Sequence, residues 1–172
     1  MSSAKVPRRA DEADFVRMVE RYGDGLLRMC CLYLNDRALA EDAVQDTFVK
    51  AYRALGRFRG ECDEKTWLTG IAINTCKNYR RNPWHRFVDR AVEMERMPER
   101  GTGDDPGDGE VLRQIAHLSK AHREVVLLYY YQELPAREIA GLLNISEEAV
   151  YARLARARRK LKTRLEGWFF DA

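Results

Sequence analysis

The sequence has no long apolar run, and this absence removes the membrane proteins from the classes to consider. No stretch approaches the roughly 18 apolar residues that a membrane-spanning helix needs, so direct insertion into a membrane is not expected. The first fifteen residues carry charges but no apolar segment of the kind that signal peptides contain. The sequence therefore predicts a cytoplasmic protein.

Cysteine and histidine are also scarce, and their spacing does not indicate a metal site. The cysteines are Cys30, Cys31, Cys62 and Cys76. They contain no C-x-x-C pair, so reduced cytosolic thiols are the simplest interpretation. Apart from the five-residue gap between His117 and His122, the histidines have no metal-binding spacing. We expect no metal and no other cofactor, and an enzyme that uses Cys76 or His85 is the weakest alternative.

Charge is plentiful but unevenly distributed. The 172 residues hold 30 basic and 27 acidic side chains, a formal net charge of +3. Residues 1–92 carry a net charge of +4, residues 93–110 carry −5, and residues 111–172 carry +4. Two basic blocks joined by an acidic strip indicate two modules that bind polyanions.

Hydrophobic periodicity predicts an all-α protein, with two small helical domains joined by a flexible acidic linker and no strands. The linker is rich in glycine, proline and aspartate and has too little apolar surface to offset the entropy of ordering. The predicted organisation is a disordered basic tail at 1–13, an N-terminal helical domain at 14–92, the linker at 93–110, and a C-terminal helix-turn-helix domain at 111–172.

The N-terminal domain is expected to contain three helices. The first begins near Phe15 and ends at Asn35-Asp36, where Asp36 can cap the second helix. Gly56 ends the second helix. The third covers Glu64–Arg81 and ends before Asn82-Pro83, because proline disfavours helix in the preceding residue; a partial turn could follow at 84–91.

The C-terminal domain is predicted to begin with a short helix near Glu110, followed by a helix that Ser119 caps. The string LLYYYQ has strand-like composition, but both flanks are helical, so helix is preferred. Asn144 then lies where a tight turn needs a positive φ, and Ser146 can cap the next helix. This pattern is typical of a helix-turn-helix whose second helix enters a DNA major groove.

A dense run of cations follows that turn. No acid lies between Glu148 and Glu166, and phosphates would explain the run better than a merely solvated helix face. The seven cations in twelve residues are Arg153, Arg156, Arg158, Arg159, Lys160, Lys162 and Arg164.

A second constellation occupies the loop before the third helix and the helix itself. Aromatic rings, amides and cations alternate there, which suits single-stranded DNA whose bases stack or are flipped out. By periodicity alone, however, a core position is favoured for Trp67. The set comprises Phe58, Arg59, Gly60, Trp67, Asn74, Lys77, Asn78, Arg80 and Arg81.

The outer face of the second helix carries acids and an amide: Glu41, Asp42, Gln45 and Asp46. Paired carboxylates need a cleft and a shifted pKa to act as catalysts, and a helix surface offers neither. We interpret this face as solvated or as a docking surface for a basic protein partner.

Two long motifs resemble bacterial sigma factors of the extracytoplasmic-function (ECF) group. The core-binding and promoter-melting module of that group is similar to DRALAEDAVQDTFVKAYRALGRFRG and TWLTGIAINTCKNYRR, and its second module to REIAGLLNISEEAVYARLARARRKL. The resemblance covers about residues 15–165. It implies a sigma factor that directs promoter-specific transcription initiation, is not an enzyme and needs no cofactor. The implied partners are core RNA polymerase, promoter DNA as duplex and as melted strand, and an anti-sigma factor.

The resemblance also implies residue roles. Asp42, Gln45, Asp46 and Phe48, with Glu41 on the same helix, match the part that docks on core polymerase. The loop from Phe58 to Gly60 matches the part that holds a flipped base of the minus-ten element. Asn74, Lys77 and Asn78 match the helix that reads the adjacent melted strand, and Trp67 matches the aromatic residue at the start of that helix.

The minus-thirty-five element would be read by the last helix. The implied set is Ser146, Tyr151, Ala152, Arg153, Ala155, Arg156, Arg158 and Arg159. The remaining alternative is a conventional helix-turn-helix regulator that binds duplex DNA without polymerase, with residues 14–92 as a sensing or dimerising domain.

Overall fold

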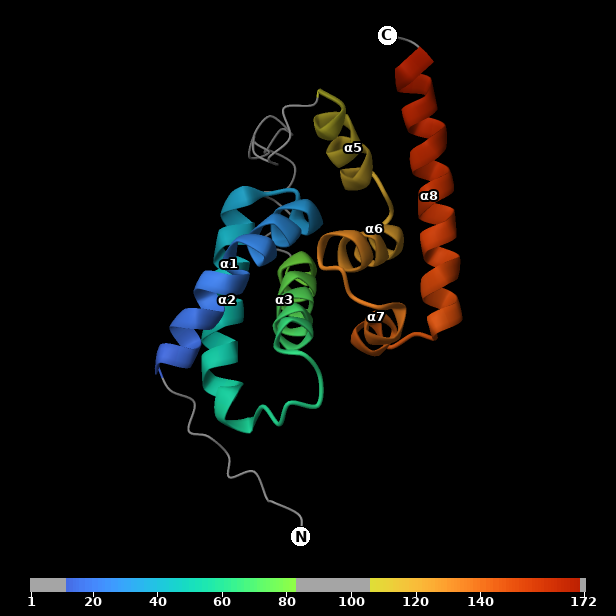
Figure 1. Ribbon diagram of the computed structural model, residues 1–172. Helices are drawn as coiled ribbons and strands as arrows, with labels where there is room; N and C mark the ends of the chain where they lie inside the picture. Colours follow the sequence, from blue (N-terminus) through green and yellow to red (C-terminus); the bar gives the residue numbers. More distant parts are fainter. Residues whose placement is uncertain (1–11, 83–105, 171–172) are drawn as a thin grey trace.

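The computed structural model describes residues 12–82 and 106–170, and within these ranges every regular element is a helix (Figure 1). The N-terminal elements are α1 (Glu12–Leu34), α2 (Arg37–Ala54), the short 3-10 helix η1 (Leu55–Arg57) and α3 (Glu64–Arg81). The predicted all-α class is confirmed, and the third helix has the predicted bounds.

The C-terminal elements are α5 (Pro106–Ala116), α6 (Lys120–Val126), η3 (Leu127–Tyr131), α7 (Ala136–Leu143) and α8 (Glu147–Phe170). Figure 1 shows this group packed beside the α1–α3 group, with α8 at the outer edge. The chain thus forms two helical domains.

Two of the predicted boundaries differ from those in the described residues. α1 begins at Glu12, and α5 begins at Pro106, so residues 106–110 are helical rather than linker. Proline suits the first helical position, because its missing N–H would have no partner there. The remainder of the predicted tail and linker, and the partial turn predicted at 84–91, lie outside the described residues.

The predicted helix caps are confirmed at three positions. The Asp36 carboxylate accepts a hydrogen bond of 2.9 Å from Leu39 N, which starts α2. Asn144 has φ 54° at the end of α7. The Ser146 hydroxyl accepts a hydrogen bond of 3.1 Å from Ala149 N at the start of α8.

Of two other local expectations, the Ser119 cap was wrong and the helical form of LLYYYQ is confirmed. Ser119 precedes α6 but makes no capping hydrogen bond through its side chain. The LLYYYQ string is helical as predicted, but it forms a wide π-helical turn, in which Gln132 N donates to Leu127 O over 3.0 Å. The wider turn is followed by buried Gln132, whose amide donates to Gly25 O of α1 over 3.2 Å.

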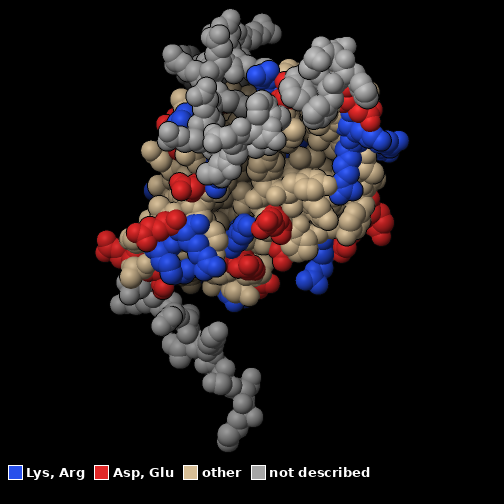
Figure 2. Space-filling view, turned by 45° about the horizontal axis from the view of Figure 1, so that its top comes forward, with Lys and Arg blue, Asp and Glu red and all other residues tan. Residues whose placement is uncertain are grey.

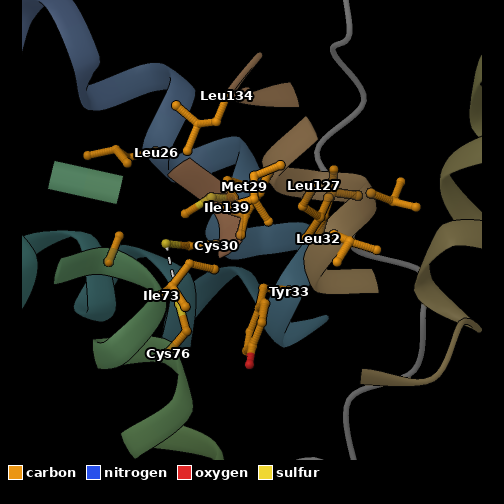
Figure 3. Packing of buried hydrophobic residues seen from close by; sticks show 14 of the residues in the cluster. Leu26, Met29, Cys30, Leu32, Tyr33, Ile73, Cys76, Leu127, Leu134 and Ile139 are labelled. Atoms are coloured by element: carbon orange, nitrogen blue, oxygen red, sulfur yellow. Dashed lines mark hydrogen bonds between the residues drawn. The ribbon is translucent and has the colours of Figure 1, made fainter. Parts of the chain in front are cut away.

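One hydrophobic core runs through both domains (Figure 3). Leu26 and Met29 of α1 and Ile73 of α3 are buried together with Leu127 and Ile139 of the C-terminal domain. Burying apolar side chains of this size stabilises a fold by about 1.5–3 kcal/mol each. The two domains are therefore packed on each other and share their core.

Two buried thiols lie within this core. Cys30 of α1 and Cys76 of α3 place their Sγ atoms 3.5 Å apart, and both residues are fully buried (Figure 3). The hydrogen bond between the two thiols and burial raise the pKa of Cys30 well above its usual value. Both cysteines are free thiols, and their burial removes Cys76 as a candidate nucleophile.

Helix α3 approaches α7 closely at a glycine. A Cβ on Gly70 would come within 2.8 Å of Leu142 Cδ2. One turn earlier, the buried Thr66 hydroxyl donates a hydrogen bond to the Glu138 carboxylate of α7. This side of α3 therefore faces the C-terminal domain, while Leu68, Ala72 and Thr75 on the opposite side are buried.

A buried polar cluster, formed by Tyr33, Arg123 and Glu124, joins the two domains. The Tyr33 hydroxyl donates to Glu124 Oε1 over 2.6 Å, and the Arg123 guanidinium donates to Tyr33 O over 3.0 Å. Arg123 also donates to the carbonyls of Ala116 and Leu118. Burial, together with the hydrogen bond to Glu124, raises the pKa of Tyr33. This Tyr33 cluster is the main polar contact across the interface.

The Tyr33 cluster predicts a large effect of Arg123→Ala on stability. The substitution leaves three buried carbonyls without their donor, so we expect the free energy of unfolding to fall by about 3 kcal/mol. Urea unfolding followed by circular dichroism measures it. Arg113→Ala is the control, because Arg113 is exposed and, among the described residues, its side chain pairs with Glu110 of its own helix. Its effect should stay within about 0.5 kcal/mol. Equal losses in the two variants would contradict the bridging role.

Candidate nucleic-acid interface

The outer face of α2 is exposed and polar, as the sequence predicts. Asp42 and Gln45 are exposed, and Glu41 is exposed but pairs with Arg37 over 2.9 Å. Asp46 is tied to α3, because the Tyr79 hydroxyl donates to its Oδ2 over 2.5 Å. Burial and this hydrogen bond raise the pKa of Tyr79. Asp42 and Gln45 are therefore the members of this face that make no such ion pair or side-chain hydrogen bond within the described residues.

Phe48 does not lie on the exposed face of α2. It is only 7% exposed, and its ring packs edge-on against Phe15 of α1, with 6.2 Å between centroids. A direct contact with a partner through Phe48 does not fit this burial. Its structural effect is to fix α2 against α1.

Two apolar residues that the sequence analysis missed share the exposed face of α2. Val49 is 48% exposed and Tyr52 is 57% exposed. They lie four and seven residues after Gln45, so the three share one side of the helix. The Tyr52 ring also packs on Phe15, with centroids 5.0 Å apart. Their helical spacing from Gln45 could have indicated that they share its exposed side. By residue type alone, however, valine and tyrosine also suit core positions.

The loop after η1 forms an aromatic pocket. The Phe58 and Trp67 rings are stacked, with centroids 4.6 Å apart and planes at 25°. Gly60 has φ 70°, a conformation in which a side chain would be strained. A cavity of about 300 Å³ lies here, bordered by Arg57, Phe58, Arg59, Glu61, Cys62 and Trp67 among others. Trp67 is half-buried and lines a pocket, so it is not a plain core residue.

One face of α3 continues from this pocket. Asn74, Asn78 and Arg81 are exposed, and they follow Trp67 by seven, eleven and fourteen residues, which places them on the same side of the helix. The structure therefore brings together an aromatic pair, two amides and a cation on one continuous surface. Amides and cations there can hydrogen-bond to base edges and phosphates, while the rings can stack on a base.

Two other predicted α3 residues turn toward the domain interface instead. Lys77 is half-buried, and its Nζ lies 3.8 Å from Glu124 Oε1. The Arg80 guanidinium lies over the Tyr33 ring, 5.4 Å from its centroid. Both side chains thus contact the Tyr33 cluster in this arrangement.

Helix α8 is amphipathic in the way that a recognition helix requires. Val150, Leu154 and Ala157 are fully buried against the domain, and Arg153 is half-buried. The exposed side carries predicted residues at positions 151, 152, 155, 156 and 159. Figure 2 shows Lys and Arg side chains along the right-hand edge, where α8 lies in Figure 1.

Arg158 is the exception among the predicted α8 residues. Its Nε donates to the Tyr130 hydroxyl over 2.6 Å, and its guanidinium lies over the rings of Tyr129 and Tyr130. It is therefore engaged within its own domain. Tyr151, also on α8, is 55% exposed, and no such contact involves it within the described residues.

The described ranges 12–82 and 106–170 contain neither a candidate metal site nor a candidate membrane-spanning helix. No group of three metal-ligating side chains lies close enough to hold an ion. None of the helices found there is long and apolar enough to cross a membrane.

Comparison with known proteins identifies the family. Residues 18–86 match the model of Sigma-70 region 2, and residues 108–161 match that of Sigma-70, region 4. The RNA polymerase sigma-H factor of Pseudomonas aeruginosa is 31% identical, covering 92% of this chain and 89% of its own. The ECF RNA polymerase sigma-E factor of Escherichia coli K12 is also 31% identical, covering 92% and 90%.

Solved structures agree with this result. CnrH, in complex with the cytosolic domain of CnrY, is 26% identical with a TM-score of 0.69, covering 92% of this chain and 91% of its own. The sigma factor RpoE, in complex with the anti-sigma factor NepR from Bartonella quintana, has a TM-score of 0.76 over 89% of this chain and 97% of its own. At 22% identity the latter shows the fold alone.

The fold and these surfaces define a helical, two-domain protein of transcription initiation. The chain belongs to the sigma-70 family and is a sigma factor of the ECF type. Sigma factors bind RNA polymerase and make initiation promoter-specific, and they are not enzymes. The conventional-regulator alternative is not favoured.

Cys62 is the exposed cysteine of the four and is predicted to be a slow nucleophile. Partial burial, with the carboxylates of Glu138, Asp63 and Glu61, raises its pKa. Its thiolate fraction at a given pH is then smaller than that of an ordinary thiol. Iodoacetamide should alkylate Cys62 more slowly than a small thiol near pH 8, yet faster than the three buried cysteines.

Peptide mapping by mass spectrometry gives these rates, with Cys62→Ser as the control that abolishes the fastest labelling. A Cys62 rate above that of the small thiol, or equal labelling of Cys30, would contradict the prediction.

Proposed function

We propose that the two domains divide promoter recognition between them. The N-terminal domain docks on core RNA polymerase and captures the melted minus-ten strand, and α8 reads the minus-thirty-five duplex. The observation that carries this proposal is the continuous surface of α3 and its preceding loop, where the stacked Phe58–Trp67 pair adjoins exposed Asn74 and Asn78. A surface that stacks bases suits an unpaired strand, and an intact duplex cannot present its bases to it.

Core polymerase is proposed to contact the outer face of α2. Asp42 and Gln45 supply exposed polar groups, while Val49 and Tyr52 supply exposed apolar area beside them. A mixed face that includes an exposed aromatic residue resembles protein interfaces, in which aromatic anchors dominate the binding energy. Its acidic groups suit a basic partner surface.

Duplex DNA is proposed to contact the exposed side of α8. The small side chains of Ala152 and Ala155 allow a close approach, and Arg156 and Arg159 flank them. Arginine can make two hydrogen bonds to a guanine in the major groove. Ser146 fixes the start of the helix, so its role here is to position it.

An anti-sigma factor is a further proposed partner, and the cytoplasm is the proposed site of action. CnrH and RpoE of Bartonella quintana were both solved with a second protein bound. An inhibitor of this chain would have to cover the α2 face or the α3 and α8 surfaces to prevent polymerase or promoter binding.

Run-off transcription tests the proposal. Core bacterial RNA polymerase, given fragmented genomic DNA, should produce specific start sites only when this protein is added. Asp42→Arg should reduce both these transcripts and the affinity for core polymerase, because it reverses a charge on the docking face without removing a packing contact. Asp24→Arg makes the same substitution at an exposed position of α1, outside the α2 face, and serves as the matched control.

Duplex binding by the protein alone, with no polymerase-dependent transcripts, would favour the conventional regulator. An unchanged polymerase affinity in Asp42→Arg would remove α2 from the docking assignment.

Asn74→Ala should impair strand capture more than initial promoter binding. Asn74 is exposed on α3, so its loss should leave the fold intact and remove hydrogen bonds to an unpaired base. Permanganate reactivity of melted thymines reports open complexes, and gel retardation on ice reports closed ones. Arg156→Ala is the reciprocal control and should weaken the closed complex. Equal losses of both complexes in Asn74→Ala would count against a melted-strand role.

A further inference from the structure

A carboxylate of the C-terminal domain contacts the helix that is proposed to bind the melted strand. Glu124 of α6 is buried, and its Oε1 lies 3.8 Å from the Nζ of Lys77 on α3. The same oxygen accepts the hydrogen bond of 2.6 Å from the Tyr33 hydroxyl. The side chain of Lys77 is only 21% exposed. Its ammonium group is therefore already paired with an anion in the packed arrangement of the domains.

The residues beside Lys77 on α3 are left accessible. Asn74 and Asn78 lie three residues before it and one residue after it, and both are exposed. Contacts with phosphates supply a large share of the affinity for nucleic acids, while amides can hydrogen-bond to base edges. The packed arrangement thus leaves two base-reading groups exposed but withholds a cation that would bind the backbone of the strand.

The pairing of Glu124 with Lys77 can be broken without leaving an unpaired buried carboxylate. Lys120 lies one turn before Glu124 on α6, and its Nζ is 4.0 Å from the same Oε1. Lys120 moves with Glu124 if α6 separates from α3, and water would then reach the carboxylate as well. A charge that keeps a partner and regains water pays little for the change. The contact is therefore suited to exchange.

The size of the molecule indicates when this exchange must occur. The names of the two promoter elements place them about 25 base pairs apart, which is about 85 Å of straight duplex. A compact chain of 172 residues has a radius of gyration of about 16 Å, and hence a diameter of about 40 Å. α3 and α8 cannot both reach their proposed elements while the two domains share one core. Binding of both elements requires α6 to leave α3.

We propose that Glu124 is an autoinhibitory residue, which occupies Lys77 in the free protein and thereby weakens the binding of single-stranded DNA. The proposal rests on the proposed melted-strand role of α3. A carboxylate and a phosphate are both charged acceptors for an ammonium group, so Glu124 and the strand compete for Lys77. The strand gains Lys77 only in molecules whose α6 has moved away, and the observed affinity falls with the fraction of such molecules.

A double-mutant cycle on the full chain tests the proposal. Fluorescence anisotropy measures the binding of a labelled single-stranded oligonucleotide of mixed sequence at one fixed salt concentration. Glu124→Gln keeps the size of the side chain and an acceptor for Tyr33 but removes the charge. The affinity should rise about fivefold, a coupling typical of charges in contact. In the Lys77→Gln background, the same substitution should change the affinity by less than about twofold.

Two further variants separate the release of Lys77 from a general effect of charge. Glu133→Gln removes the same charge from an exposed position of the same domain and should leave the affinity unchanged. Glu124→Asp keeps the charge but shortens the side chain by one methylene, so the carboxylate draws back from Lys77. Its affinity should rise, though less than that of Glu124→Gln. Circular dichroism checks that each variant is folded.

Hydrogen exchange of the unaltered protein provides a measurement that needs no variant. A saturating concentration of the oligonucleotide should speed the exchange of backbone amides in α6, because the helix loses its contacts with the N-terminal domain when the strand takes Lys77. This measurement decides the question where a Glu124 variant is not folded.

Three results would overturn the proposal. An affinity gain that persists in the Lys77→Gln background, or that Glu133→Gln reproduces, would show a general effect of charge. Unchanged affinity in both folded Glu124 variants would remove Glu124 from the control of strand binding. Unchanged or slower exchange in α6 with the oligonucleotide bound would show that the strand binds without displacing this helix.

The proposal and the function on which it rests fail in distinguishable ways. Fewer open complexes in Asn74→Ala, without the coupling between Glu124 and Lys77, would support the melted-strand role of α3 and reject autoinhibition. Absence of polymerase-dependent transcripts from the unaltered protein would count against the proposed function, and the cycle would still decide whether Glu124 restrains binding to single-stranded DNA.

Discussion

The buried guanidinium of Arg123 is the contact on which the arrangement of the two domains depends. Its acceptors include the carbonyl of Tyr33, near the end of α1, and that of Ala116, the last residue of α5. Carbonyls at helix ends have no intrahelical partner, and a cation there also complements the helix dipole. A buried charge in turn requires such partners. One side chain thus fixes two helix ends from different domains against α6.

The packing of the domains divides the residues of α3 between structure and recognition. Lys77 and Arg80 face the Tyr33 cluster, so the domain interface already engages them. Asn74, Asn78 and Arg81 remain exposed beside the Phe58–Trp67 pair. A strand that used Lys77 would have to replace Glu124 as its partner, whereas the exposed amides can be reached in the packed arrangement.

Local signals predicted the elements well where the chain itself decides them. The bounds of α3, the Asp36 and Ser146 caps and the positive φ of Asn144 all follow from nearby residues. Helical periodicity also places Phe48 on the buried side of the second helix, but it does not predict that Phe15 of α1 packs against it. Local signals likewise do not predict the contact beside the π-helical turn, where the Gln132 amide donates to Gly25 O of α1.

By itself the sequence determined the class of fold and the helix-turn-helix, because periodicity, caps and motif spacing are local properties of the chain. Its motifs also resembled the sigma factors closely enough to indicate the family, which the matches to regions 2 and 4 show. Only the tertiary structure decided that both domains share one core, that Arg158 turns back onto its own tyrosines, and that Glu124 of α6 contacts Lys77 of α3. These features join residues far apart in sequence, and their positions depend on which helix faces meet when apolar surface is buried.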